Sequence, residues 1–204
     1  MDMEKELLRL QELSRYEREL WDKGIRYVCG IDEAGRGPLA GPVTAAAVIL
    51  PVDTLIPGVN DSKKLSAKKR ETLAAEIKEK SLAWACVCVD HRTIDEINIL
   101  EASKLAMLKA VEKLSVHPEH LLIDAVKLDT DIPCTPLIHG DALSISIAAA
   151  SIIAKTTRDH LMELADAKWP EYGFAKHKGY PTAAHKQALR EYGPCPIHRR
   201  SFRY

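Results

Sequence analysis

Residues 30–38 place two adjacent carboxylates in a glycine-rich stretch that runs Gly30-Ile31-Asp32-Glu33-Ala34-Gly35-Arg36-Gly37-Pro38. The apolar residues 27–29 lead directly into it, so a strand is expected to end at the acidic pair. Apolar strands seldom end in two charges unless a cation or a catalytic task holds them there. A polar turn is the alternative interpretation, because Asp and Gly are common turn residues.

The bulk composition describes an ordinary globular chain. Its 204 residues suit one domain with an appendage, and 46% hydrophobic with 28% charged residues is typical of a folded soluble protein. Acidic and basic residues balance at 29 each, although the segment from residue 155 onward is richer in Lys and Arg. That segment could face a polyanion, or it could be a solvated surface.

The compartment is expected to be cytoplasmic. Residues 1–22 alternate acids and bases without an apolar centre, so they do not form a signal peptide. No apolar run approaches the roughly 20 residues that span a bilayer. The five cysteines contain no Cys-x-x-Cys pair, which argues against a disulfide framework or a zinc site.

The hydrophobic pattern predicts alternating strands and helices. Strands are expected at residues 25–32, 43–50, 82–89, 120–124 and 136–139. Helices are expected at residues 3–22, 67–80, 93–114, 143–168 and 182–192, with Ser66 as an N-cap. Strand 82–89 is apolar on both alternating sides, so burial on both faces is expected. This order predicts an α/β domain of residues 25–204 around one sheet, with residues 1–24 as a helical appendage.

Three positions in this pattern bring carboxylates together. Asp32 with Glu33 and Asp124 stand at strand ends, and Asp141 opens the long helix. Ligands of open α/β sheets bind outside the C-terminal strand ends, where these acids would repel one another without a cation. Oxygen ligands without a His or Cys cluster indicate Mg²⁺ or Mn²⁺, and two such ions about 3.5–4 Å apart suit attack on a phosphodiester. The alternatives are a turn residue at Asp124 and a plain helix cap at Asp141.

Residues 30–42 resemble the signature of bacterial ribonuclease HII, of the type 2 ribonuclease H family. Further matches to this family occur at residues 61–65, 97–103, 122–125, 149–159, 177–182 and 198–202. The resemblance covers roughly residues 25–204. It implies a ribonuclease H-like fold, in which helices flank a five-stranded mixed sheet and a helical extension follows at the C-terminal side.

The resemblance also implies an activity. The family hydrolyses the RNA strand of RNA–DNA hybrids and incises duplex DNA on the 5′ side of single ribonucleotides, a step of ribonucleotide excision repair. The products carry 5′-phosphate and 3′-hydroxyl ends. By motif, Asp32, Glu33, Asp124 and Asp141 would be the catalytic acids that hold two Mg²⁺ or Mn²⁺ ions with the substrate. A monomer is expected.

Substrate contacts follow from the same resemblance. The backbone of Gly35, Arg36 and Gly37 would sense the 2′-hydroxyl, which separates RNA from DNA. Tyr180 would contact the same hydroxyl and stack on the neighbouring deoxyribose; alone, it would be interpreted as a loop aromatic.

Basic residues supply the remaining candidates. Phosphate contacts are expected from Lys63, Lys64, Lys155, Lys178, Arg199 and Arg200. Lys68, Lys69 and Arg70 are interpreted as a solvated helix face, and the histidines at 177, 185 and 198 as local hydrogen-bonding groups or phosphate ligands. His139 replaces a lysine that many relatives carry, which would weaken the positive charge there.

Two other functions compete with the nuclease. A non-catalytic duplex-binding module would keep the scaffold without needing all four acids. Another metal-dependent nuclease of the same fold class, such as a junction resolvase, would not need the Gly35-Arg36-Gly37 and Tyr180 combination.

Overall fold

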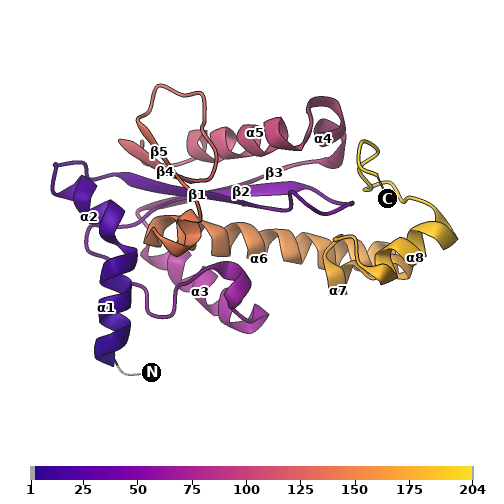
Figure 1. The fold of residues 1–204 in the computed structure, drawn as a ribbon, viewed down its shortest axis with the longest axis horizontal. Helices are drawn as coiled ribbons and strands as arrows, with labels where there is room; N and C mark the ends of the chain where they lie inside the picture. The colour runs from indigo at the N-terminus through magenta and orange to yellow at the C-terminus, as the bar shows by residue number, and fades with distance from the viewer. Residues whose placement is uncertain (1–2, 204) are drawn as a thin grey trace.

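A five-stranded mixed sheet forms the centre of the molecule (Figure 1). The computed structural model describes residues 3–203. The strands are β1 (Val28–Ala34), β2 (Val43–Ile49), β3 (Ala83–Val89), β4 (His120–Asp124) and β5 (Cys134–Leu137), in the order β3-β2-β1-β4-β5. The first three strands pair antiparallel, whereas β4 lies parallel to β1 and β5 parallel to β4. The C-terminal ends of β1 and β4 therefore meet at one edge of the sheet.

Helices cover both faces of this sheet (Figure 1). One face carries α4 (His91–Ile97) and α5 (Ile99–Glu112), and the other carries α6 (Ile145–Lys168) with α3 (Ala67–Lys80) behind it. Short 3₁₀ helices lie at η1 (Ser62–Lys64), η2 (Gly140–Ala142) and η3 (Pro170–Tyr172). The part of the chain that the structure describes contains no helix long and apolar enough to cross a membrane.

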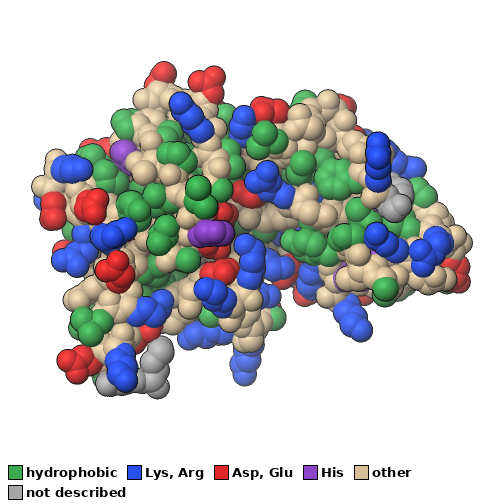
Figure 2. Space-filling model, viewed as in Figure 1, with side chains coloured by type: hydrophobic (Ala, Val, Ile, Leu, Met, Phe, Trp, Pro, Cys, Tyr) green, Lys and Arg blue, Asp and Glu red, His purple; other side chains and the backbone are tan. Residues whose placement is uncertain are grey.

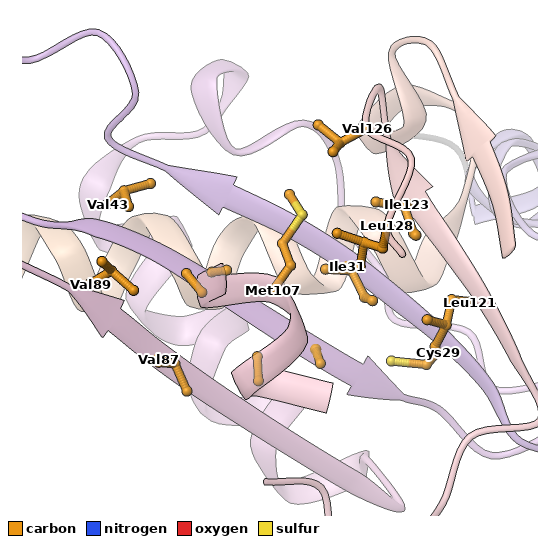
Figure 3. Close-up of a cluster of buried hydrophobic side chains, with 14 of the residues drawn as sticks. Cys29, Ile31, Val43, Val87, Val89, Met107, Leu121, Ile123, Val126 and Leu128 are labelled. Carbon is orange, nitrogen blue, oxygen red and sulfur yellow. The ribbon is translucent and has the colours of Figure 1, made fainter. Parts of the chain in front are cut away.

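Two apolar cores follow from the alternation of side chains along the strands. Odd-numbered residues of β1 and β2, such as Ile31 and Ala45, face α5 and surround Met107 (Figure 3). Even-numbered residues of β2, such as Ala46 and Val48, pack with the apolar first half of α6 and with α3. Gly30 lies under α6 so closely that a Cβ there would collide with backbone atoms of Ser146 and Ile147. The long helix thus lies directly against the central strand.

The N-terminal segment packs on the same side as α3 and α6. It forms two helices, α1 (Met3–Leu13) and α2 (Arg15–Trp21), so the prediction of one continuous helix over 3–22 was wrong. The Ser14 hydroxyl donates to the carbonyl of Leu10 at 2.7 Å, a bond that competes with helix continuation. Leu10 and Leu13 are buried in the core that α3 and α6 share.

A second predicted helix is also divided. Residues 93–114 were expected to be continuous, but Asn98 has a left-handed φ of 69° and separates α4 from α5. Its side-chain oxygen accepts hydrogen bonds from the amides of Leu100 and Glu101, which caps the new helix. Asn suits this position because its side-chain oxygen caps the first amides of the new helix.

The strand at residues 83–89 differs from its prediction in burial. It was expected to be buried on both faces, yet it is an edge strand in which Trp84 and Cys88 are exposed. On this second apolar side, the ammonium of Lys78 lies 4.7 Å from the Trp84 ring centre. The fifth strand also lies two residues earlier than predicted, at Cys134–Leu137.

The C-terminal segment forms a helical extension with its own small core. It contains α7 (Phe174–His177), which was not among the predicted helices, and α8 (Ala183–Tyr192), whose N-cap Thr182 accepts from the amide of His185. Phe174 and Leu189 pack there with Leu39 of the loop after β1. A bridge between Ala40 and His198 brings residues 195–202 back onto that loop.

Candidate active site

The acidic cluster, defined as Asp32, Glu33, Asp124 and Asp141, forms where β1 and β4 end. Asp32 and Glu33 lie in the last part of β1, and Asp124 is the last residue of the parallel strand β4. Asp141 lies in η2, which joins β5 to α6. The amide of Gly140 donates to Asp124 Oδ1 at 2.6 Å and so ties η2 to the end of β4.

Asp141 does not cap the long helix. That alternative is wrong, because Ser144 is the N-cap of α6 and its hydroxyl accepts from the amide of Ile147. The buried carboxylate of Glu17 on α2 fixes this start further, since it accepts from the Ser144 hydroxyl and from the amide of Ser146 at 2.9 Å. The N-terminal segment thereby helps to position Asp141, a link that the sequence pattern did not predict.

Burial and mutual repulsion raise the pKa values of three carboxyl groups of the cluster. Burial raises the pKa of Asp32 well above its ordinary value, and the charges of Glu33 and Asp124 raise it further. Burial also raises the pKa of Glu33, against the opposing charge of Arg36. The pKa of Asp141 is raised by burial and by Asp61. Such a site gains free energy when a cation replaces the protons.

Two flexible cations approach the cluster without neutralising it. Lys63 Nζ lies 3.9 Å from Asp141 Oδ2, and Arg36 Nη1 lies 3.6 Å from Glu33 Oε1. Burial would lower the pKa of Lys63, but the charges of Asp141 and Asp32 outweigh it and raise that pKa. Both contacts are longer than a strong charged hydrogen bond.

The cluster fits a divalent cation by its chemistry. All its donors are carboxylate oxygens, the ligands that Mg²⁺ and Mn²⁺ prefer. Glu33 Oε2 is buried, yet it has no hydrogen-bond partner among residues 3–203. In the same range, no three His, Cys, Asp or Glu side chains already converge as an ion site.

A cleft of about 450 Å³ opens beside the cluster. It is lined by Asp32 and Glu33 on one side, by residues 35–37 and Tyr180 on another, and by Lys63, Arg70 and Lys155. Tyr180 is 41% exposed, and a Cβ on Gly37 would just touch its ring at 3.4 Å. The predicted 2′-hydroxyl contacts thus lie together, within one cleft with two of the predicted metal ligands. On the face in Figure 2, acidic side chains and Lys or Arg side chains lie side by side near the centre.

The predicted phosphate contacts divide into two groups. Lys155 lines the cleft, where its ammonium contacts Asp159 at 2.5 Å and burial lowers its pKa. Lys64 is exposed but lies beside α1, away from the cleft. Lys178 pairs with Glu163 at 2.6 Å.

Arg199 lies elsewhere than expected. Its side chain is fully buried and donates to main-chain carbonyls of the loop after β1. It therefore holds that loop and does not make the phosphate contact that had been predicted. The neighbouring Arg200 is exposed, and its amide donates to Asp95. His139 is exposed in a left-handed conformation just before η2.

Arg70 takes a role that the sequence pattern did not indicate. Interpreted as part of a solvated helix face, it lines the cleft and donates to the carbonyl of Leu65 at 2.6 Å. His185 and His198 take the first of the two roles expected of them: they are buried and bond to each other at 3.0 Å as local hydrogen-bonding groups.

The family model of ribonuclease HII matches residues 29–204. The chain belongs to the ribonuclease HII family. A ribonuclease HII of Syntrophomonas wolfei is 57% identical over 97% of this chain and 78% of its own length. One of Bacillus cereus is 56% identical over 98% and 77% of the two chains.

Solved structures agree with the fold. The ribonuclease H2 of Pyrococcus horikoshii matches with a TM-score of 0.73 and 28% identity, over 86% of this chain and 93% of that one. The ribonuclease HII of Archaeoglobus fulgidus, solved in complex with PCNA, matches with a TM-score of 0.73 and 26% identity. This match covers 87% of this chain and 96% of that one. These matches confirm the predicted ribonuclease H-like fold. Membership in the ribonuclease HII family also makes the chain a metal-dependent hydrolase of the ribonuclease H type, which acts on RNA–DNA hybrids.

Proposed function

We propose that this enzyme incises duplex DNA on the 5′ side of a single embedded ribonucleotide, as well as the RNA strand of hybrids, and so serves ribonucleotide removal from DNA. The observation that carries this proposal is the shared cleft: residues 35–37 and Tyr180 line it together with Asp32 and Glu33. The residues proposed to read the sugar thus line the same cleft as two of the residues proposed to hold the ions. The RNA–DNA difference lies in the 2′-hydroxyl, so a local sugar contact suffices to recognise one ribonucleotide.

The acidic cluster would hold two Mg²⁺ or Mn²⁺ ions. When bound, these ions would stabilise the attacking and leaving oxygens of an in-line displacement at phosphorus, which leaves 5′-phosphate and 3′-hydroxyl ends. The carboxylates of Asp32, Glu33 and Asp124 come from the adjacent strands β1 and β4, whereas Asp141 comes from η2 outside the sheet. Lys63 and Lys155 at the cleft supply positive charge for the phosphates of the substrate.

The expected activity has a direct measurement. Three duplexes of one sequence are prepared, each with the same unlabelled DNA strand. The labelled strand is all DNA in the first, DNA with one ribonucleotide in the second, and all RNA in the third. With Mg²⁺ or Mn²⁺, the second is expected to give one cut on the 5′ side of the ribonucleotide, the third several cuts, and the first none. Tyr180→Ala should slow the single cut by about 10²-fold, because loss of a side chain that positions the substrate typically costs a factor of that size. Tyr192→Ala is the control, since Tyr192 is an exposed tyrosine of α8, and it should leave the rate unchanged.

Cleavage of the all-DNA duplex at a similar rate would contradict ribonucleotide specificity. A cut at the hybrid alone, with the single ribonucleotide intact, would restrict the enzyme to hybrids. A non-catalytic module would bind all three duplexes and cut none, and a junction resolvase would cut branched DNA without ribose.

Ion binding is expected to stabilise the fold. Because burial and mutual repulsion raise the pKa values of Asp32, Glu33 and Asp141, the metal-free cluster opposes folding at neutral pH. Adding Mg²⁺ or Mn²⁺ at 100 times its Kd should stabilise the protein by about 2.7 kcal/mol, or roughly 5–10 °C in Tm. Thermal scans with and without EDTA measure this shift. Its persistence in Asp124→Asn at the same ion concentration would contradict the assignment of the ligands.

A further inference from the structure

We propose that Arg158 and Arg199 form an arginine clamp that orients the backbone of residues 35–42 toward the ribose, and that both are positioning residues for substrate selection. The proposal rests on the proposed function, since it concerns the loop that would read the 2′-hydroxyl. The two side chains are 1% and 0% exposed, so they cannot bind the substrate themselves.

The hydrogen bonds of Arg199 end on successive carbonyls of the loop. Its Nη2 donates to Gly35 O at 2.6 Å and to Pro42 O at 3.1 Å, its Nη1 to Arg36 O at 3.0 Å and its Nε to Gly41 O at 2.9 Å. One guanidinium therefore holds both ends of the loop. The planar fork of arginine, with five N–H donors, is suited to several acceptors at once.

Arg158 connects this loop to the segment that carries Tyr180. From α6, its Nε donates to Pro42 O at 2.9 Å and its Nη2 to Ala40 O at 3.1 Å, while its Nη1 donates to Lys178 O at 3.0 Å. The amide of Leu39 donates to Gly179 O at 2.8 Å beside it. Arg158 thus ties the C-terminal half of the loop to the segment that precedes Tyr180.

The direction of these bonds has a consequence for the opposite side of the loop. In a trans peptide the N–H points away from the C=O of the same unit. Because the carbonyls of Gly35 and Arg36 point inward to Arg199, the amides of Arg36 and Gly37 point outward. Residues 35–37 line the cleft on that side. The clamp therefore turns hydrogen-bond donors toward the place where a ribose would lie.

The space around the loop leaves no room for a looser arrangement. Gly35 has a φ of 99°, and a Cβ there would collide with the Arg158 side chain. Burial lowers the pKa of Arg199, to about 9, so the guanidinium still carries its charge at neutral pH. Two buried positive charges behind the loop also make its outward amides better donors to an oxygen ligand.

The test replaces each arginine by lysine, which keeps the charge and loses the fork. Arg158→Lys and Arg199→Lys are compared with the parent and with Arg190→Lys, an exposed arginine of α8 that serves as the matched control. The Kd for duplex DNA with one ribonucleotide and the Kd for the same all-DNA duplex are measured in EDTA. Steady-state incision of the first duplex is measured with Mg²⁺ or Mn²⁺.

A positioning role predicts a loss of discrimination and not of binding in general. The ratio of the two Kd values should fall toward 1 in both clamp variants, and kcat/KM for incision should fall about 10- to 100-fold. The rise of Tm on adding the ion should persist, because the acidic cluster is untouched. Arg190→Lys should match the parent in all three measurements. A merely structural role would weaken the binding of both duplexes by the same factor and leave the ratio of the two Kd values unchanged.

The outcomes separate the two proposals. A parent that does not incise the single-ribonucleotide duplex would overturn the proposed function. A parent that incises it, with folded clamp variants that keep the parental Kd ratio, would overturn the clamp alone. If neither lysine variant folds, amide hydrogen exchange of the parent protein tests whether the loop is held in place. The amides of Leu39 and Gly41 should then exchange as slowly as those of β1, and exchange at the rate of an open loop would overturn the clamp.

Discussion

Replacing Asp32 by asparagine should abolish incision and at the same time raise the stability of the metal-free protein. Asp32 lies at the end of the central strand and is nine-tenths or more buried. An amide cannot supply the negative oxygen that a divalent ion requires, and such an ion is worth several kcal/mol in the transition state. Since each 1.36 kcal/mol is tenfold in rate, kcat should fall by at least about 10³-fold.

The gain in stability follows from the sign of the pKa shift. Burial, then the charges of Glu33 and Asp124, raise the pKa of Asp32 in the folded state. The resulting penalty is present above that raised pKa and disappears as pH falls toward the unfolded value of about 3.9. The variant should therefore melt higher than the parent at pH 8 in EDTA, by about 2–4 °C per kcal/mol of relief. The difference should shrink as the pH is lowered.

Asp22→Asn is the control for this pair of measurements, because Asp22 is exposed near the end of α2. It should change neither the rate nor the melting temperature. Parental activity in Asp32→Asn would remove Asp32 from the catalytic site. A lower melting temperature of Asp32→Asn in EDTA would contradict the account of repulsion within the acidic cluster.

Replacing Gly30 by alanine should lower the free energy of unfolding more than adding a methyl group at any other position of the domain. The added Cβ would collide with the backbone of Ser146 and Ile147, and backbone atoms cannot rotate away as side chains do. Overpacking typically costs about 1–3 kcal/mol and more when the backbone must shift, so about 3 kcal/mol or more is expected. For a chain of this size that lowers Tm by roughly 6–12 °C.

The same change should disturb catalysis before it unfolds the protein. Pushing α6 away from β1 also moves η2, because Ser144 and Gly140 join the two elements. Asp141 would then move relative to Asp32. Gly37→Ala is the control for stability, since its Cβ would meet only the Tyr180 ring at ordinary contact distance. Equal Tm values for the two variants, measured by thermal unfolding, would contradict the close approach of helix and strand.

Several parts of the site follow from the sequence because they depend on local order. Asp32 and Asp124 each end an apolar run, and parallel strands end at one edge, so their meeting could be predicted from pattern alone. The N-cap Ser66 was predicted from local sequence as well, and its hydroxyl accepts from the amide of Lys69. The family signature added the pairing of residues 35–37 with Tyr180, which a shared cleft now makes physically consistent.

Other parts depend on contacts between distant segments, which no local pattern contains. Arg158 has charged neighbours on a helix and resembles a solvent-facing residue, yet it is buried against residues 40–42. Arg199 lies in a basic run but turns inward. Glu17 lies in a helix rich in charges, and its burial requires the start of α6 to be known first. Each is a buried polar group with at least two partners that lie more than a hundred residues away in the sequence.

The return of residues 195–202 onto the loop has a consequence for synthesis. Strands β1 to β5, η2 and the helix α6 that holds η2 are complete once residue 168 has been made, so all four carboxylates can then assemble around the sheet. Arg199, however, follows Gly35 by 164 positions. At about 5–20 residues per second, the ribosome adds it roughly 8–33 s later. A nascent chain would thus have its acidic cluster assembled before the loop proposed to contact the ribose is held in place. Discrimination between ribose and deoxyribose would be the last property of the enzyme to form.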